Sequence, residues 1–431
     1  MKSKIIFVCP YYPPFGSGGA ERTAHLHANI LKKMGYDIVI VTPKYGNTKF
    51  ENKNDIHIIS FNLNKKLSIG ENLNTRFFYN PLVQNKLKHT IERNFKSSDI
   101  KCIHVNHQLL LDGAARASKS LNVPLVTHIR DTGLICSLGG SCLIDRNVCD
   151  VPSFKTQFMH HIWCYFNNWK KHQNLNTLPK LVYGFFKSLI PYYIFSKNLK
   201  HLKKSKKMVF ASEGLLKIYS EYWKLKENSS CKVVYAMAKK IFTKTKVKNS
   251  LIENFKKNNF PIILYVGKLS IGKGVDTLFK AHKLVLNKIP NAKLLICGNK
   301  YSKWDYDEKN TVFLGFIDQE NLNYIYSKSN LVVVPSTWPE PLGWSTIDAG
   351  RHSKPIVATK VGGIPEAIIN NKTGILVEKL DYLNMGKGIL KLLQNKNLSK
   401  KYGHAGHIHI FKNFGEDRVS AQLKDLYSSF N

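Results

Sequence analysis

Short apolar runs alternate with longer amphipathic stretches along this chain, and the alternation starts twice. In the first half, the apolar runs predict β-strands at 4–10, 38–43, 56–61, 103–106, 125–129 and 208–212. The stretches between them with helical spacing are 19–34, 81–95 and 109–121. Strand and helix in alternation predict βαβ units, and therefore a parallel sheet that helices cover on both faces.

The same alternation restarts near residue 261. Its predicted strands are 262–268, 292–298, 312–316, 331–336 and 356–359, and its predicted helices are 276–286, 321–327 and 344–351. A chain of 431 residues is also too long for one ordinary core and suits two α/β domains of about 200 residues each. The sequence therefore predicts the α/β class, with two Rossmann-like, doubly wound domains.

A weakly patterned, lysine-rich segment between the two alternations sets the predicted domain boundary. We expect an N-terminal domain over 1–238, a C-terminal domain over 239–412, and a last helix within 413–431 that returns to the N-terminal domain. In open parallel sheets, ligands bind beyond the carboxyl ends of the strands. Two such sheets that face a central cleft would place the functional residues in the loops after the strands.

A basic and aromatic insertion, 151–207, interrupts the predicted N-terminal domain. Between Asp150 and Glu213 there are eleven lysines and no acidic residue, in a chain with a net charge of +36. Lysines interleaved with aromatic side chains are typical of a surface in a membrane interface. The alternative is that the aromatic side chains pack into the domain core and the lysines form its solvated face. With no apolar stretch long enough to span a bilayer, we expect a cytoplasmic protein, peripheral on the anionic inner face of the cell membrane.

The first predicted strand of the second domain runs into a turn rich in glycine and lysine. Gly267 and Lys268 begin this turn, and Lys273 follows between two further glycines. Glycines let backbone amides approach a diphosphate, and two lysines five positions apart can neutralise its charge. The alternative is an ordinary glycine turn with surface lysines. The spacing of a Walker loop is absent.

Two acidic residues eight positions apart follow the strand predicted at 331–336. Glu340 lies in the loop ahead of a predicted helix and Asp348 lies on that helix, so both can face a ligand at the helix start. An acidic cap on the helix is the alternative. The neighbouring residues that we expect to line the same site are Leu342, Gly343, Gly362 and Gly363.

In the first domain, candidate residues follow two of the predicted strands. Gly18 and Gly19 open the first helix, directly after the first strand. His128, Arg130 and Asp131 stand at the end of the strand 125–129, where a ligand would bind. Either His128 or Arg130 can occupy the position nearest to a reacting group, and a histidine at a strand end can equally be structural.

Taken together, these stretches closely resemble the retaining GT-B glycosyltransferases of family four, which include bacterial lipopolysaccharide and mannosyl transferases. The resemblance covers nearly the whole chain and is strongest over 261–377. The family's first turn in the second domain reads Gly-Arg-Leu followed by Lys-Gly, so Lys268 stands where arginine is usual and Lys273 matches the lysine. The family's two acidic residues match Glu340 and Asp348, with aspartate in place of the usual second glutamate.

The resemblance implies a metal-independent, hexosyltransferase-like enzyme that moves a sugar from a UDP- or GDP-sugar to a glycan or lipid-linked acceptor. Such a reaction belongs to the synthesis of cell-surface polysaccharides or glycolipids, and the donor is a substrate, so no cofactor is expected. By the same resemblance, Lys268 and Lys273 grip the donor diphosphate, Glu340 lies against the donor sugar, and Asp348 accepts hydrogen bonds from the ribose. The residues expected on the catalytic side are Glu340, His128, Arg130 and Asp131.

Two further clusters of residues and two further functions are compatible with parts of the sequence. Cys136, Cys142, Cys149 and Cys164 have no Cys-x2-Cys pair, which favours ordinary loop cysteines over a zinc site. Asp305 and Asp307 lie in a polar loop away from the expected site. A sugar-nucleotide epimerase of the same fold is the nearest alternative function. A nucleic-acid binding protein would fit the positive charge but would not explain the acidic pair, and we expect no nucleic acid as a partner.

Overall fold

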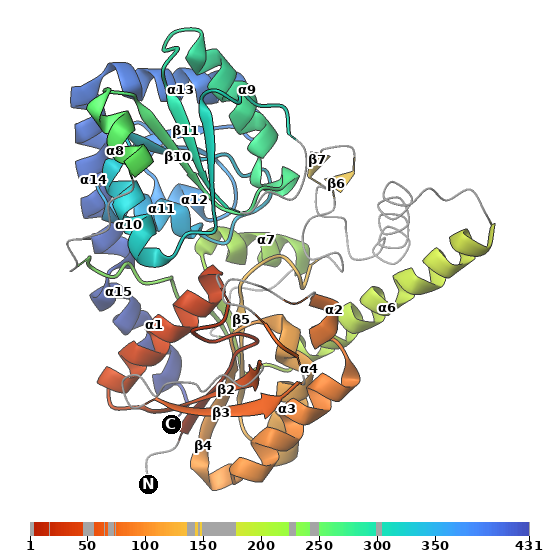
Figure 1. The fold of residues 1–431 in the computed structure, drawn as a ribbon. Coiled ribbons are helices and arrows are strands. Elements are labelled where there is room, and N and C mark those ends of the chain that lie inside the picture. Colours follow the sequence, from red (N-terminus) through yellow and green to blue (C-terminus); the bar gives the residue numbers. More distant parts are fainter. Residues whose placement is uncertain are drawn as a thin grey trace. The chain divides into compact units, whose positions relative to one another are not determined.

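The computed structural model describes residues 4–16, 18–45, 56–63, 65–67, 73, 75–135, 143–144, 147–148, 178–223, 230–241, 250–298 and 304–430. The chain divides into two compact units. Unit 1 consists of Met1–Met237 with Val419–Asn431, and unit 2 consists of Ala238–Arg418. Each unit has a parallel sheet of its own, and Figure 1 labels the elements of both.

Unit 1 is built on a seven-stranded parallel sheet with the order β3-β2-β1-β4-β5-β8-β9. Its strands are β1 (Lys4–Val8), β2 (Asp37–Lys44), β3 (His57–Asn62), β4 (Ile100–Val105), β5 (Leu125–Ile129), β8 (Lys207–Phe210) and β9 (Cys231–Val233). Its helices are α1 (Gly19–Lys33), α2 (Thr75–Phe78), α3 (Pro81–Asn94), α4 (Leu111–Leu121), α6 (Leu178–Lys203), α7 (Glu213–Trp223) and most of α15 (Glu416–Ser428). Two further short strands, β6 (Leu143–Ile144) and β7 (Asn147–Val148), pair antiparallel.

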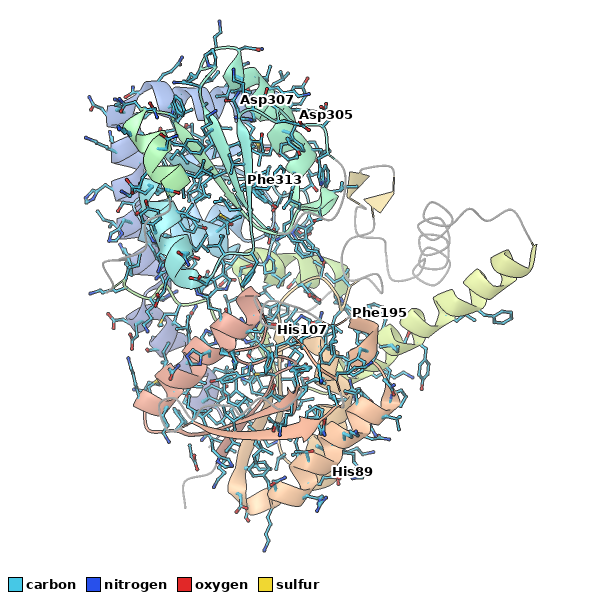
Figure 2. All side chains as sticks on the ribbon, viewed as in Figure 1. His89, His107, Phe195, Asp305, Asp307 and Phe313 are labelled. Carbon is cyan, nitrogen blue, oxygen red and sulfur yellow. The ribbon has the colours of Figure 1, made fainter. Side chains whose placement is uncertain are left out.

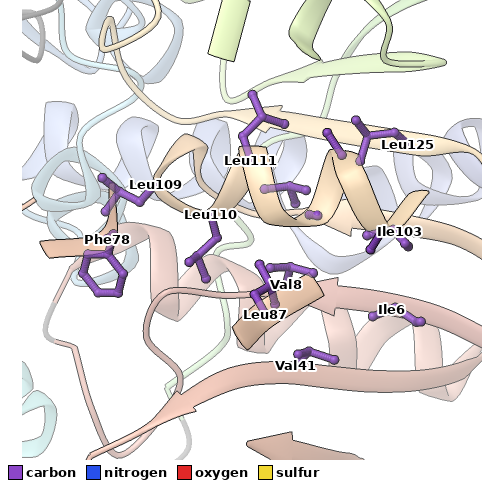
Figure 3. Packing of buried hydrophobic residues seen from close by; sticks show 14 of the residues in the cluster. Ile6, Val8, Val41, Phe78, Leu87, Ile103, Leu109, Leu110, Leu111 and Leu125 are labelled. Atoms are coloured by element: carbon purple, nitrogen blue, oxygen red, sulfur yellow. The ribbon is translucent and has the colours of Figure 1, made fainter. Parts of the chain in front are cut away.

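The core of unit 1 explains why its strands are short apolar runs. In β1, the side chains from Ile5 to Val8 are fully buried, which requires cover on both faces of the sheet. Figure 3 shows one part of this core, where strand residues pack against Leu87 of α3 and Leu111 of α4. The strand residues labelled there are Ile6, Val8, Val41, Ile103 and Leu125.

The helix ends of unit 1 follow the usual sequence signals. Gly18 caps α1, Glu21 lies in its first turn, and two lysines lie in its last turn, so the charges complement the helix dipole. The Asn80 side chain accepts a hydrogen bond from the Leu82 N–H at 2.9 Å, and Pro81 occupies the first position of α3. These signals account for the starts of α1 and α3.

Unit 2 is built on a six-stranded parallel sheet with the order β12-β11-β10-β13-β14-β15. Its strands are β10 (Ile262–Val266), β11 (Lys293–Cys297), β12 (Thr311–Gly315), β13 (Leu331–Val334), β14 (Ile356–Thr359) and β15 (Gly374–Val377). Its helices are α8 (Ser250–Lys257), α9 (Val275–Leu286), α10 (Gln319–Lys328), α11 (Trp344–Arg351), α12 (Ile364–Ala367), α13 (Tyr382–Gln394) and α14 (Lys396–Phe414). The strand order reverses between β10 and β13, which is where open sheets of this kind bind ligands.

The predicted fold class is confirmed, because both units are doubly wound parallel sheets with helices. Every strand predicted from an apolar run is present, although several end earlier than predicted. β10 ends at Val266 and β13 ends at Val334, so the candidate residues that follow them lie in loops. The elements that the pattern did not predict include β9, β15, α6, α13 and α14.

α6 is the described part of the basic insertion, and Figure 1 shows it extending from unit 1. Its last turns are anchored in two ways. The side chains of Phe195 and Leu199 are buried. Asp112 of α4 accepts hydrogen bonds from Lys197 (3.0 Å) and His201 (2.9 Å). Farther toward its start, Phe186 is 61% exposed. Among the described residues, no helix is both long and apolar enough to cross a bilayer.

Candidate functional site

The glycine turn after β10 is held against the loop after β13. Gly274 has a φ of +66°, and a Cβ at this position would lie 1.7 Å from the carbonyl oxygen of Pro335. The N–H groups of Thr337 and Trp338 donate hydrogen bonds to the carbonyl oxygen of Gly272 at 3.0 and 3.2 Å. Only glycine fits this close approach, so the turn that carries Lys273 has a fixed place beside the loop that carries Glu340.

Three donors converge on one oxygen of Glu340. Lys273 Nζ, Ser336 Oγ at 2.7 Å and Trp338 Nε1 at 2.7 Å all donate hydrogen bonds to Glu340 Oε1. Burial of this carboxyl favours the neutral acid, but the Lys273 ammonium and the three hydrogen bonds outweigh burial, so the pKa of Glu340 lies below its usual range. Glu340 is therefore a buried, ionised carboxylate with a fixed orientation.

Trp338 connects the two charged residues and was not anticipated from the sequence. Its ring centre lies 4.8 Å from Lys273 Nζ, and its indole N–H binds Glu340. An ammonium over an indole face is electrostatically favourable. The only sequence signal for Trp338 and Ser336 was their position between the end of β13 and Glu340.

The second glycine pair supports the backbone of Glu340. The Gly363 N–H donates to the Glu340 carbonyl oxygen at 2.8 Å. Gly362 has a φ of +53°, and a Cβ there would lie 2.1 Å from the same oxygen. Leu342 is buried, and Gly343, with a φ of +79°, precedes the first residue of α11. The structure thus brings these predicted residues together around Glu340.

Asp348 lies on α11 and has a partner that the sequence analysis did not name. Its Oδ1 accepts a hydrogen bond from Arg351 Nη1, and both side chains are buried. Arg351 Nε also donates to the carbonyl oxygen of Lys239 at 2.6 Å. This pair lies three residues apart on one helix, a spacing that permits contact.

Of the two predicted phosphate ligands, Lys268 is exposed and lies beyond the end of β10, whereas Lys273 is half-buried.

In unit 1, the glycines before α1 surround the side chain of Glu21. A Cβ on Gly16 or Gly18 would lie 2.7 or 2.5 Å from atoms of Glu21. Burial raises the pKa of this carboxyl, and hydrogen bonds from backbone N–H groups, including that of Gly18, only partly offset the effect. Gly19 is the first residue of α1, and its carbonyl oxygen accepts a hydrogen bond from Thr23 Oγ1 at 2.6 Å. The predicted glycine loop therefore encloses a buried acid.

His128 and Arg130, the two alternatives at the end of β5, have different surroundings. His128 lies inside β5, where its Nδ1 is 3.3 Å from Nε2 of His104 and its ring stacks on His27. Burial lowers the pKa of His128 well below its ordinary value, so its ring is neutral. Nδ1 of His104 lies in turn at hydrogen-bond distance from the Tyr427 hydroxyl of α15.

Arg130 follows the last residue of β5, at the edge of the sheet where ligands bind in this fold. Its Nη2 donates to Asn106 Oδ1 at 3.1 Å. Burial lowers the pKa of Arg130 to about 9, against the opposing influence of Cys9 and Glu21. Arg130, rather than His128, is therefore the charged residue that β5 places at this edge.

Asp131 is a well-supported carboxylate next to Arg130. Its Oδ1 accepts hydrogen bonds from Gln108 Nε2 at 2.6 Å and from the Gly133 N–H at 2.7 Å, and its Oδ2 lies 3.5 Å from His107 Nε2. Burial alone would raise the pKa of Asp131, but His107 and the other donors lower it below the ordinary value. Figure 2 labels His107 in this part of unit 1.

The remaining predicted positions carry no site in the described part of the chain. Cys136, Cys142, Cys149 and Cys164 all lie outside the described residues. Asp305 is exposed and pairs with Lys283 at 2.8 Å, while Asp307 accepts a hydrogen bond from the Asn310 N–H at 2.7 Å (Figure 2). Within the described ranges, no three His, Cys, Asp or Glu side chains are grouped so that they could hold a metal ion.

Two family models match most of the chain between them. The family described as Glycosyltransferase Family 4 matches residues 17–206, and the family described as Glycosyl transferases group 1 matches residues 247–408. The first match covers most of the sheet of unit 1, and the second covers the strands of unit 2, including both loops that carry Lys273 and Glu340.

Curated relatives match over part of their length. The capsular polysaccharide biosynthesis glycosyltransferase CapM of Staphylococcus aureus is 29% identical over 196 residues, which are 42% of this chain and 50% of that protein. A glycogen synthase of Mycobacterium tuberculosis is 25% identical over 173 residues, which are 38% of this chain and 42% of that protein. The matches thus span about half the length of these relatives.

Solved structures match over nearly the whole chain. A sucrose-phosphate synthase from Thermosynechococcus elongatus matches with a TM-score of 0.69 and 17% sequence identity. The match covers 99% of this chain and 99% of that chain. HepE of Anabaena, solved in complex with UDP-glucose, has a TM-score of 0.66 at 17% identity, again with 99% of each chain covered. At these identities the likeness concerns the fold.

Proposed function

Because this chain belongs to the GT-B glycosyltransferases of the family-four type, we propose that it transfers a sugar from a nucleoside-diphosphate sugar to an acceptor. The observation that carries the proposal is the arrangement of Lys273 and Glu340 beyond the carboxyl ends of β10 and β13. An ammonium suits a diphosphate and an ionised, fixed carboxylate suits the hydroxyl groups of a sugar.

The proposed donor is a UDP- or GDP-sugar. HepE of Anabaena, whose fold this chain shares, was solved with UDP-glucose, which supports a uridine nucleotide. In our proposal, Lys268 and Lys273 contact the diphosphate, Glu340 contacts the sugar, and Asp348, oriented by Arg351, accepts from the ribose. Gly267, Gly343 and Gly363 let the backbone approach the donor. These roles agree with the way in which the family resemblance assigns them.

The proposed reaction retains the anomeric configuration and uses no metal. We assign the Ser336 hydroxyl, which donates to Glu340 Oε1 at 2.7 Å, to the orientation of that carboxylate and not to nucleophilic attack. The protein's contribution is then electrostatic: Lys268 and Lys273 stabilise the charge that develops on the departing diphosphate. We propose that the acceptor, a glycan or a lipid-linked glycan, is bound by unit 1 through Arg130, Asp131 and the loop that contains Gly18 and Gly19.

The family models do not favour the epimerase alternative, and they match transferases on both units. A nucleic-acid binding protein would leave the Lys273–Glu340 arrangement without a purpose. Polysaccharide synthesis is supported by the similarity to CapM, whose printed function is capsular polysaccharide biosynthesis. We therefore retain cell-surface polysaccharide or glycolipid synthesis as the proposed context.

The donor assignment is tested by nucleotide binding to the Lys273→Ala variant. A charge-assisted hydrogen bond contributes about 1.5 to 3 kcal/mol, so the variant should bind UDP or GDP about 10- to 100-fold more weakly in calorimetry. Lys288→Ala, which removes an exposed lysine beyond the end of α9, is the matched control and should bind like the parent. Equal affinity of the Lys273 variant and the parent would exclude our assignment of this turn.

We also propose that α6 docks the protein on an anionic membrane surface, where a lipid-linked acceptor is presented. Phe186 and Tyr193 of α6 are 61% and 67% exposed, and the helix carries lysines without any acidic residue. Aromatic side chains enter an interface, and each lysine near an anionic surface contributes about 1 kcal/mol. Because Phe195 is buried, not all of the aromatic residues are available for such contact.

Co-sedimentation with vesicles of varied phosphatidylserine content tests this docking. The parent should sediment with anionic vesicles at low salt, and Phe186→Ser with Tyr193→Ser should bind severalfold less. The matched control is Leu82→Ser, which changes an exposed apolar residue of α3. A parent protein that stays in the supernatant would exclude the docking and leave the proposed transfer reaction untouched.

A further inference from the structure

The Lys273 ammonium is bound to Glu340 in this structure, although the proposed donor needs the same ammonium for its diphosphate. Lys273 Nζ donates to Glu340 Oε1 and also lies 4.8 Å from the centre of the Trp338 ring. A carboxylate and a diphosphate carry charge of the same sign, so they compete for one cation and repel each other. We therefore expect a bound donor to weaken the contact between Lys273 and Glu340.

We propose that Lys273 is exchanged between two anions during each reaction cycle. Without donor its ammonium closes on Glu340, and a bound nucleoside diphosphate takes the ammonium away, which leaves Glu340 to contact the donor sugar. Trp338 acts as a positioning residue for both charged groups. The inference rests on the proposed function, because it needs a nucleoside-diphosphate donor.

The geometry allows the lysine side chain to move while its backbone stays in place. The backbone of the turn is fixed by the hydrogen bonds to Gly272 and by the close approach of Gly274 to Pro335. The Lys273 side chain is 28% exposed, whereas that of Glu340 is 5% exposed. A lysine stem has four rotatable carbon bonds, so the ammonium can reach a ligand that approaches from solvent.

Glu340 keeps its orientation after the ammonium leaves. The Ser336 hydroxyl and the Trp338 indole N–H, both at 2.7 Å, continue to donate to its Oε1. Removing the only partner of a buried charge would be strongly destabilising, but here two neutral donors remain. The face of the Trp338 ring also offers the ammonium a favourable contact on its path. Ser336 and Trp338 thus hold the Glu340 carboxylate in place, whereas Lys273 is the donor that leaves.

The exchange predicts that a neutral residue at position 340 strengthens nucleotide binding. Glu340→Gln keeps the volume of the side chain but removes the competing and repelling charge, so the variant should bind UDP about 3- to 30-fold more tightly than the parent. Glu378→Gln removes the same charge at an exposed position of unit 2 and should leave UDP affinity unchanged. A role of Glu340 confined to holding the loop predicts weaker binding instead.

A double-mutant cycle identifies Lys273 as the group that is exchanged. In the Lys273→Ala background, the gain from Glu340→Gln should shrink to the part that relief of charge repulsion contributes, because no ammonium is left to compete for. Trp338→Phe keeps the ring and removes the N–H that binds Glu340. It should lower kcat while changing the KM for the donor less than twofold, a division that general loss of structure would not produce.

Calorimetry with UDP and with GDP decides between the outcomes. If the parent binds either nucleotide and Glu340→Gln binds it equally or more weakly, the exchange is overturned and the proposed function stands. If the parent binds neither nucleotide, the proposed donor class and the exchange are both overturned. Circular dichroism shows whether Glu340→Gln folds. If it does not fold, the deciding measurement is the UDP-induced change in tryptophan fluorescence that the parent shows and Trp338→Phe lacks. Absence of that change in the parent overturns the exchange.

Discussion

The loops at the carboxyl ends of the strands differ between the two units in how their buried polar groups are satisfied. In unit 2, Glu340 accepts three hydrogen bonds and Asp348 pairs with Arg351. In unit 1, the described residues provide no hydrogen-bond partner for Glu21 Oε2 or Arg130 Nε. A buried polar group without a partner costs about 1 to 3 kcal/mol. In unit 2, Asp276 Oδ1 in the first turn of α9 also has no hydrogen-bond partner among the described residues. The contrast therefore concerns the candidate residues Glu340 and Asp348, not every buried group at this edge.

In our proposal, the two units control different steps of the reaction. Charged groups that are already oriented suit the binding of a donor whose phosphate and sugar always present the same chemistry. Buried polar atoms that lack partners are commonly found where a ligand completes the set. We therefore expect changes near Lys273 and Glu340 to alter donor binding and reaction, and changes near Arg130 to alter the reaction without altering nucleotide affinity.

The largest effect is expected for the reaction rate of Glu340→Gln. Loss of a preorganised charged group at a reacting centre typically lowers kcat by about 100-fold or more, so transfer at saturating donor should fall by about 100-fold while circular dichroism stays unchanged. Initial rates with a saturating donor measure it, and Glu378→Gln is again the control. A variant that turns over like the parent would reduce Glu340 to a residue that supports its loop.

A smaller effect, confined to one unit, is expected for Arg130→Gln. The substitution keeps a hydrogen-bond donor for Asn106 and removes the cation at the edge of β5, so transfer should fall about tenfold. UDP affinity should stay within twofold of the parent. His128→Asn is the comparison variant, because His128 lies inside β5 among other histidines; it should lower stability more than rate. If His128→Asn instead lowers the rate more than the stability and Arg130→Gln leaves the rate unchanged, His128 is the residue nearest to the reacting group.

The sequence predicted the fold class because the central strands of both units are buried on both faces. Residues 5–8 and 331–334 are continuous apolar runs, and runs of this kind are visible without any knowledge of contacts. β9 was not predicted because it is only three residues long with a lysine at its centre, and β15 was not predicted because only three apolar residues follow its first glycine. α6 was not predicted because its apolar and polar residues do not follow a clear helical period.

The candidate site was predictable residue by residue but not as an arrangement. Glycines, lysines and acids after strands indicated Lys273 and Glu340 separately, yet their contact depends on the fit of Gly274 against Pro335 across sixty residues. Trp338 gave no signal beyond its position between the end of β13 and Glu340, because an aromatic residue in a loop can have many roles. The Asp348–Arg351 pair has a readable helical spacing, but the spacing alone does not show that the pair is buried.

The smallest effect concerns the anchor of α6 in unit 1, where Asp112 binds Arg116, Lys197 and His201. Burial would raise the pKa of Asp112, but these partners lower it from 3.8 to about 2. A carboxyl with a lowered pKa in the folded state stabilises the fold above its unfolded pKa, and this contribution is lost as the pH falls through the folded pKa. The stabilisation is therefore complete above about pH 4 and disappears toward pH 2.

Asp112→Asn should consequently reduce the free energy of unfolding by about 1 kcal/mol at pH 6, after allowance for solvent screening. The difference from the parent should shrink toward pH 2, and UDP affinity should not change, because the substitution lies in unit 1. Urea denaturation at several pH values measures both. Asp305→Asn, which removes an exposed partner of Lys283 in unit 2, should cost almost nothing at any pH. If the two substitutions cost the same at pH 6, the Asp112 cluster does not anchor α6 more firmly than an ordinary surface ion pair would.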